Sequence, residues 1–201
     1  MLEKDSKNYH VWSYRQWLVR RFELWEQGEL EAVEEMLKKD IRNNSAWNHR
    51  WFVVFGRGEA LFKDAQIVER EIKYGSTSSA HYRYDSMLTD SHRYAQSCIR
   101  PAPQNQSPWN YLRGTIRYAK KLQSTLKGFA GEFASLDKPD DVCSSHALDL
   151  LADIYAEEEN KKEDAGKALD LLAARYDPIR ANYWNYRKSL LQYSDMPATP
   201  T

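Results

Sequence analysis

Apolar residues recur along this chain at steps of three and four, the spacing that places side chains on one face of an α-helix. The pattern is clearest over residues 29–41, 149–157 and 165–176. No segment alternates apolar and polar residues with the period of two that a strand needs. Only 8 glycines and 7 prolines interrupt the 201 residues. The sequence therefore predicts an all-α fold.

A tryptophan-centred motif recurs along the chain. Its copies read KNYHVWSYRQWLVRRF from Lys7, RNNSAWNHRWFVVFGR from Arg42, PQNQSPWNYLRGTIRY from Pro103 and IRANYWNYRKSLLQY from Ile179. An arginine follows each tryptophan by three or four positions. The pairs are Trp12 and Arg15, Trp47 and Arg50, Trp109 and Arg113, and Trp184 and Arg187. The first two tryptophans lie 35 positions apart, the length of one helical hairpin in a solenoid.

Each motif contains residue types with a structural role in helical repeats. Asn8, Asn43 and Asn105 stand four residues before a tryptophan, where an asparagine can cap the helix that follows. The tryptophan is a large apolar wedge that we expect to pack against the neighbouring hairpin, and the arginine can pair with a carboxylate of an adjacent repeat. The sequence thus predicts an α-α superhelix, a tetratricopeptide-like solenoid of about four to five antiparallel hairpins. The wide spacing after Trp109 predicts a degenerate copy near residues 144–155.

Composition narrows the classes of function. The 29 basic and 29 acidic residues give a net charge of zero, which argues against binding to nucleic acid or a membrane surface. No membrane span or signal peptide is evident, so we expect a cytoplasmic protein. The two cysteines, Cys98 and Cys143, are expected to be ordinary buried thiols, and the five histidines show no metal-ligand spacing with them. The sequence predicts neither a catalytic residue nor a metal site in this chain.

These motifs closely resemble the repeats of protein prenyltransferase α subunits, and in particular the α subunit shared by farnesyltransferase and type I geranylgeranyltransferase. The resemblance rests on KNYHVWSYRQWLV and DIRNNSAWNHRWFVV and continues through VEREIKY, PQNQSPWNYLRG, LADIYAEE and YWNYRKSL. It covers most of residues 3–192. The α subunit of the Rab-type enzyme has similar repeats, and a non-catalytic tetratricopeptide-like scaffold would explain the tryptophans and arginines equally well.

The resemblance implies a heterodimeric enzyme. Its β subunit would hold the catalytic Zn²⁺, with Mg²⁺ used in the farnesyl reaction, while this chain would hold no cofactor. The pair would transfer a prenyl group from farnesyl or geranylgeranyl diphosphate to the cysteine of a C-terminal C-a-a-X motif in an acceptor protein. This chain alone is expected to be inactive.

The resemblance also implies a binding site in the loop that precedes the first motif. In the family, the matching residues Lys7, Asn8, Tyr9 and His10 lie beside the diphosphate and the acceptor peptide. Tyrosine hydroxyl and imidazole N–H groups are reasonable donors to a diphosphate. The alternative interpretation is structural, with Asn8 only a helix cap and Tyr9 a packing residue.

The chain departs from the family in two places. It starts within a repeat, so we expect an N-terminally truncated repeat domain over residues 1–193, without the upstream repeat that carries the principal diphosphate lysine. Residues 75–94 begin with Gly-Ser-Thr-Ser-Ser and show no helical apolar stripe, which predicts a non-native insertion that forms an exposed loop if it is expressed. Their excision would place Val68, Ile72 and Ala95 on one helical face. Residues 194–201 are expected to be a disordered tail.

Overall fold

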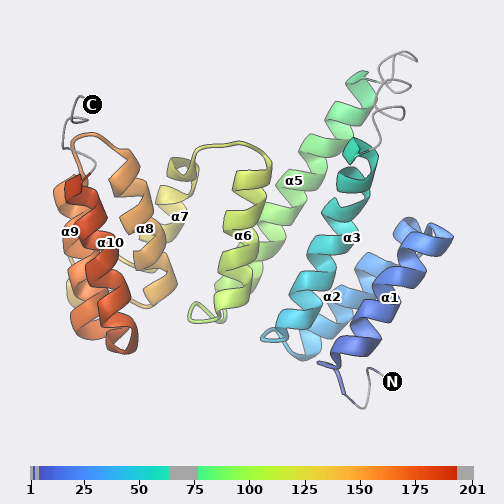
Figure 1. The fold of residues 1–201 in the computed structure, drawn as a ribbon, viewed down its shortest axis with the longest axis horizontal. Helices are drawn as coiled ribbons and strands as arrows, with labels where there is room; N and C mark the ends of the chain where they lie inside the picture. The colour runs from blue at the N-terminus through green and yellow to red at the C-terminus, as the bar shows by residue number, and fades with distance from the viewer. Residues whose placement is uncertain (1, 3–4, 64–76, 194–201) are drawn as a thin grey trace, which may run out of the picture. The chain divides into compact units, whose positions relative to one another are not determined.

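A computed structural model describes residue 2 and residues 5–63 and 77–193, and its regular elements in these ranges are all helical (Figure 1). The all-α prediction is therefore confirmed for the described residues. The longer helices are α1 (Tyr9–Phe22), α2 (Glu29–Lys39), α3 (Asn44–Lys63), α5 (Thr77–Ile99), α6 (Gln106–Tyr118), α7 (Lys127–Gly131), α8 (Ser145–Glu157), α9 (Lys162–Leu171) and α10 (Ala181–Tyr193). Short 3₁₀ turns cover Leu24–Glu26, Gln123–Leu126, Pro139–Asp141 and Pro178–Arg180, and a π-helical turn covers Leu172–Tyr176.

The chain divides into two compact units. The first unit comprises residues 1–98 and 110–115, and the second comprises residues 99–109 and 116–201. Helices α5 and α6 contribute residues to both units. In the first unit, α1 and α2 both pack against α3. In the second, α8 packs against α9, and α9 packs against α10.

The core of the first unit forms where α1 turns into α2. Val19, Trp25, Phe52 and Val53 make one buried cluster between these segments and α3. Gly28 precedes α2 with a φ of +80°, in the left-handed region where a side chain would be strained, so a glycine suits this sharp entry. The turn brings the acidic helix α2 alongside the basic side chains of its neighbours.

The four motif tryptophans are buried, and each makes the same type of hydrogen bond. Each indole N–H donates to a backbone carbonyl six or seven residues earlier, which fixes the loop before the helix to the side chain inside it. The pairs are Trp12 with Ser6 (2.9 Å), Trp47 with Ile41 (2.9 Å), Trp109 with Pro103 (2.8 Å) and Trp184 with Asp177 (3.2 Å). The apolar ring thus orders the loop as well as filling the core.

Motif arginines bind carboxylates on a neighbouring helix. Arg15 of α1 binds Glu29 of α2 with an Nε–Oε2 distance of 2.9 Å, and Arg50 of α3 binds Glu34 of α2 at 2.8 Å. In the second unit, Arg187 of α10 binds both Asp149 and Asp153 of α8. Arg113 lies half-buried on α6. Because these pairs join different helices, they set the packing register of the hairpins.

Helix α8 repeats the geometry of a motif helix without its tryptophan. Its cap residue Ser144 accepts a hydrogen bond from the backbone N–H of Ala147. The same hydroxyl donates to the carbonyl of Pro103, which also accepts the Trp109 indole N–H. Four positions after the cap stands Leu148, fully buried where the other copies have tryptophan. Residues 144–157 are therefore a repeat with leucine in the tryptophan position.

The exposed-loop prediction for residues 75–94 is wrong where the structure describes them. Residues 77–94 belong to the helix α5, which continues to Ile99. Leu88, Ser91, Ala95 and Ile99 are all buried, at steps of three and four that line one helical face. The stripe is hard to see in the sequence because one of its members is a serine. The prediction that the segment is foreign to the working protein is a separate one and stays a prediction; Gly75 and Ser76 lie outside the described residues.

Other expectations have mixed outcomes. Cys98 is half-buried and Cys143 is exposed, so the prediction of two buried thiols is wrong. Cys143 is exposed because it lies in the loop between residue 141 and α8, where its thiol donates to the carbonyl of Asp141. None of the helices in the described ranges is long and apolar enough to cross a membrane. The tail predicted over residues 194–201 lies outside the described residues.

Candidate functional site

The candidate binding residues lie in the short loop that enters α1 and in the first turn of that helix. The carboxylate of Asp5 accepts a hydrogen bond from the backbone N–H of Lys7 at 3.1 Å, and its carbonyl accepts one from the N–H of Asn8 at 3.3 Å. The loop is therefore folded by its own aspartate before the helix begins. Lys7 and Asn8 lie in this loop, and Tyr9 and His10 begin the helix.

Asn8 caps the helix. Its side-chain oxygen accepts a hydrogen bond from the backbone N–H of Val11 at 3.1 Å, and its backbone is extended, as a cap residue requires. The structure thus gives Asn8 the structural role that was one of its two interpretations. The cap aligns the first turn of α1, so it holds the neighbouring Tyr9 and His10 in place.

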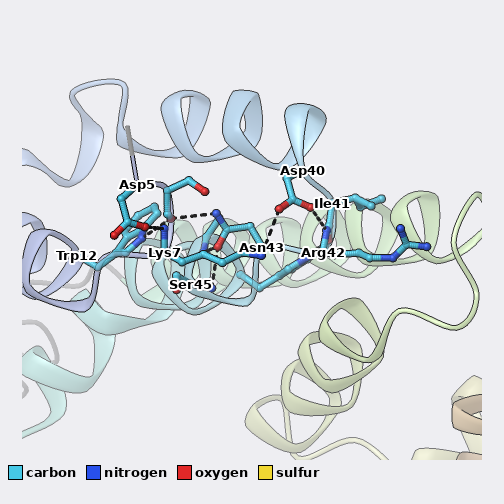
Figure 2. Close-up of polar contacts among 11 residues, drawn as sticks. Asp5, Lys7, Trp12, Asp40, Ile41, Arg42, Asn43 and Ser45 are labelled. Atoms are coloured by element: carbon cyan, nitrogen blue, oxygen red, sulfur yellow. Dashed lines mark hydrogen bonds and ion pairs between the residues drawn. The ribbon is translucent and has the colours of Figure 1, made fainter. Parts of the chain in front are cut away.

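A second loop, at the start of α3, is joined to the first (Figure 2). Asn43 is only 1% exposed, and its side-chain oxygen accepts hydrogen bonds from the backbone N–H groups of Ser45 (3.1 Å) and Ala46 (3.2 Å). Its amide N–H₂ donates to the carbonyl of Ser6 at 3.0 Å. That carbonyl also accepts the Trp12 indole N–H, so one oxygen holds two side chains from two repeats. Sequence reasoning identified Asn43 as a cap but missed this link between loops 37 residues apart.

An ion pair runs parallel to the link. The ammonium of Lys7 lies 3.6 Å from the carboxylate of Asp40, with the two side chains 61% and 45% exposed. A pair this exposed contributes little to stability, because water screens it and two side chains must be ordered. The other oxygen of Asp40 accepts the backbone N–H of Arg42 at 2.9 Å. Lys7 is therefore held near the second loop, while the exposed side chain of Arg42 extends away from the cluster (Figure 2).

Tyr9 and His10 present polar groups to solvent. Tyr9 is 77% exposed, and its ring meets the His10 ring edge-on with the centroids 5.7 Å apart. Within this chain the Tyr9 ring contacts His10 and buries little of its surface, and its role stays a prediction. A phenol hydroxyl and an imidazole thus stand together at one helix start, where N–H groups and the helix dipole also favour an anion, while the ammonium of Lys7, from the loop just before them, faces Asp40. The arrangement can bind a negatively charged group but contains no nucleophile and base in contact.

A buried polar cluster joins α1 to α2 and α3. Arg15 and His49 both contact Glu29, with 3.0 Å between His49 Nε2 and Glu29 Oε2. Burial acts to raise the pKa of Glu29, but hydrogen bonds from Arg15 and His49 outweigh it and hold this pKa below its ordinary value. Burial lowers the pKa of His49 and outweighs the hydrogen bond to Glu29. His49 is therefore a neutral donor to an ionised glutamate, which fixes α1, α2 and α3 together.

No metal centre is evident in the described part of the chain. Residues 2, 5–63 and 77–193 bring together no group of three or more histidine, cysteine, aspartate or glutamate side chains that could hold a metal ion. The described residues therefore offer no coordination set for zinc.

The chain is similar to known proteins. Residues 1–22 and 26–56 match the family described as Protein prenyltransferase alpha subunit repeat. The chain is 38% identical over 207 residues to the protein farnesyltransferase/geranylgeranyltransferase type-1 subunit alpha of Candida albicans, which covers 93% of this chain and 67% of that protein. It is 33% identical over 177 residues to the protein of the same name from Dictyostelium discoideum, which covers 87% of this chain and 45% of that protein.

A solved structure agrees with these similarities. It is that of Candida albicans protein geranylgeranyltransferase-I complexed with GGPP, with a TM-score of 0.79, 36% sequence identity, and coverage of 95% of this chain and 56% of that chain. The fold class and the resemblance predicted from the sequence are thereby confirmed. The chain spans about half to two thirds of the length of these relatives.

Proposed function

The chain belongs to the protein prenyltransferase α-subunit family, and from that membership we propose that it is the α subunit shared by protein farnesyltransferase and type I geranylgeranyltransferase. In this role it works with a β subunit on C-a-a-X proteins. The acceptor cysteine sulfur forms a thioether bond to the isoprenoid, and the bond to the diphosphate breaks, so the diphosphate leaves with the electron pair.

The observation that carries this proposal is the 38% identity to the Candida albicans α subunit over nearly the whole chain. The geometry of the α1 loop is consistent with it. Lys7, Tyr9 and His10 stand exposed at a helix start that Asn8, Trp12 and Asn43 hold rigid. Donors fixed in advance are what a departing diphosphate needs, because they stabilise its charge without reorganising.

We assign the residues separate roles. Tyr9 donates its hydroxyl proton to a diphosphate or peptide oxygen, and His10 donates a ring N–H to the same group. Lys7 adds positive charge beside them. Asn8 and Asn43 act as positioning residues, because the side-chain oxygen of each accepts backbone N–H groups at the start of its helix and the Asn43 amide also binds the Ser6 carbonyl.

Zinc chemistry belongs, in this proposal, to the β subunit. A zinc ion there would lower the pKa of the acceptor thiol and present the thiolate, and Mg²⁺ would assist the farnesyl reaction. This chain contributes donors and a binding surface. We further propose that residues 1–193 act as one repeat domain, that residues 75–94 are not part of the working protein, and that the enzyme is cytoplasmic.

Coexpression with a β subunit tests the proposal. The purified complex is assayed for transfer from farnesyl or geranylgeranyl diphosphate to a C-a-a-X peptide, and diphosphate affinity is measured in parallel because activity is expected to be weak. Loss of one hydrogen bond to a charged group costs about 1.5–3 kcal/mol, so Tyr9→Phe should weaken diphosphate binding about tenfold or more. His10→Ala should have a similar effect.

Tyr14→Phe is the matched control, because Tyr14 is also an exposed tyrosine of α1 but lies outside the loop. It should leave diphosphate affinity unchanged. Equal losses of diphosphate affinity in Tyr9→Phe and Tyr14→Phe would show that the start of α1 is not part of the binding site. A complex that binds no isoprenoid diphosphate at all would favour a non-catalytic scaffold instead.

A further inference from the structure

Asp40 places a carboxylate beside the loop that is proposed to bind a diphosphate. It follows α2 directly, and its backbone N–H donates to the carbonyl of Met36 at 3.0 Å. Its Oδ1 accepts the backbone N–H of Arg42 at 2.9 Å, and its carbonyl accepts the backbone N–H of Asn43 at 3.0 Å (Figure 2). These three contacts hold the Asp40 carboxylate in one place.

The turn at Asp40 does not need a negative charge. The side-chain oxygen of an asparagine can accept a backbone N–H group in such a turn as that of an aspartate does. Asn8 and Asn43 make contacts of this kind in the same two loops. A negative charge near a bound diphosphate also opposes its binding by repulsion. The geometry of the turn therefore does not explain why residue 40 is an aspartate.

The second carboxylate oxygen of Asp40 faces Lys7. This Oδ2 lies 3.6 Å from the Lys7 ammonium, which is longer than a hydrogen bond, and water reaches both side chains. By contrast, the guanidinium of the buried Arg50 lies 2.8 Å from the carboxylate of Glu34. Lys7 is therefore paired with Asp40 by charge alone, and such an exposed pair opens at low cost.

Lys7 can change its partner without moving its main chain. Its backbone N–H is bound to the carboxylate of Asp5 at 3.1 Å, and the next residue, Asn8, caps α1. The mobile part is the flexible four-carbon side chain, whose ammonium has three donors. Tyr9 and His10 follow directly in the first turn of α1. An anion bound by these two side chains would compete with Asp40 for the Lys7 ammonium.

We propose that Asp40 is a positioning residue for Lys7. It holds the ammonium at the loop while the site is empty and gives it up when the diphosphate binds. Lys7 then pairs with a phosphate oxygen, and the Asp40 carboxylate returns to water. The pair sets a threshold for binding, because the ligand must attract the ammonium more strongly than one carboxylate does. This inference rests on the proposed function, since it concerns the same diphosphate site.

A double-mutant cycle in the complex with the type I β subunit tests the exchange. The affinity for geranylgeranyl diphosphate is measured for the unchanged chain, Asp40→Asn, Lys7→Gln and the double variant. Asparagine keeps an acceptor for the Arg42 N–H, so the turn is retained. We expect Asp40→Asn to tighten binding, with a gain about two to five times larger when residue 7 is lysine than when it is glutamine, since exposed ion pairs are worth about this factor. The difference should shrink as salt is raised.

Glu35→Gln is the matched control. Glu35 is another exposed carboxylate of α2, but it pairs with Lys38 of the same helix at 2.6 Å. Its replacement should leave the diphosphate affinity unchanged.

Three results would overturn the proposal while leaving the proposed function intact, because the diphosphate still binds in each. Asp40→Asn could weaken binding, its effect could be the same with lysine and with glutamine at position 7, or Glu35→Gln could have an equal effect. Failure of all four chains to bind the diphosphate would instead refute the proposed function, and this inference with it.

Discussion

Asn43 should contribute more to stability than an ordinary helix cap, because its side chain makes two different kinds of contact. Its oxygen caps α3, and its amide N–H₂ binds the Ser6 carbonyl in the loop before α1. Asn8 makes the capping contact at the start of α1. Comparison of alanine variants at these two asparagines therefore isolates the link between the repeats.

The expected magnitudes follow from the contacts. Loss of a cap costs about 1 kcal/mol, and loss of a buried hydrogen bond about 1 kcal/mol more. The Ser6 carbonyl is still satisfied in the variant, because the Trp12 indole donates to it, so no further penalty arises from an unpaired acceptor. Asn43→Ala should thus lower the free energy of unfolding by about 2 kcal/mol and Asn8→Ala by about 1 kcal/mol. Asn43→Ser, which keeps the cap and loses the link, should fall between the unchanged chain and Asn43→Ala.

Urea denaturation followed by circular dichroism gives these differences directly. Limited proteolysis supplies a local readout, since loss of the link should speed cleavage after Lys7 in Asn43→Ser but not alter cleavage at distant sites. Equal destabilisation by Asn43→Ala and Asn8→Ala would refute the reasoning. So would an Asn43→Ser variant as stable as the unchanged chain.

Three further outcomes are expected. In the same urea assay, Gly114→Ala should lower the free energy of unfolding by about 1–3 kcal/mol, because a Cβ there would lie 2.8 Å from the Trp51 ring of α3. Gly128→Ala is the control: a Cβ at Gly128 would meet nothing within 4 Å, so this variant should be as stable as the unchanged chain or more stable. Stability should fall as the pH drops below about 6.5, since burial lowers the pKa of His49 and the unfolded chain takes up the proton first. His49→Gln should therefore flatten the dependence of the thermal midpoint on pH, and a slope equal to that of the unchanged chain would contradict this. Deletion of residues 75–94 should keep or raise the thermal midpoint, because Val68 would then take the place of the buried Leu88, and Tyr74 that of Tyr94, in the stripe that continues to Ala95. A lower midpoint would show that the segment is integral.

The repeat made much of the fold predictable. The motif helices can be located from a tryptophan that has an asparagine before it and an arginine after it. Few other positions of a helical hairpin need so large an apolar ring close to a helix cap. Even the copy with Leu148 in place of tryptophan could be inferred from spacing. Helix α5 could not be predicted in this way. The run Gly-Ser-Thr-Ser-Ser over residues 75–79 is typical of a loop, and the buried position Ser91 is polar, so the apolar periodicity is interrupted. Burial of a small polar residue depends on the neighbouring helices and not on local sequence.

The position of the loop before α1 was predictable from the sequence, but the contacts that hold it were not, and its role as a binding site stays a prediction. The motif around Tyr9 and His10 indicates where the loop lies, because a helix cap follows directly from Asn8. The link from Asn43 to Ser6 joins residues distant in sequence, so no local pattern could predict it. The neutral state of His49 likewise arises from burial among three helices.

Copurification with different β subunits tests the central claim most directly. The chain is coexpressed with the β subunit of farnesyltransferase, of type I geranylgeranyltransferase or of the Rab-type enzyme, and complexes are isolated through a tag on the β subunit. We expect a complex of one α and one β chain with each of the first two and none with the third. Recovery with the Rab-type β subunit alone, or with none of the three, would contradict the assignment of this chain as the shared α subunit.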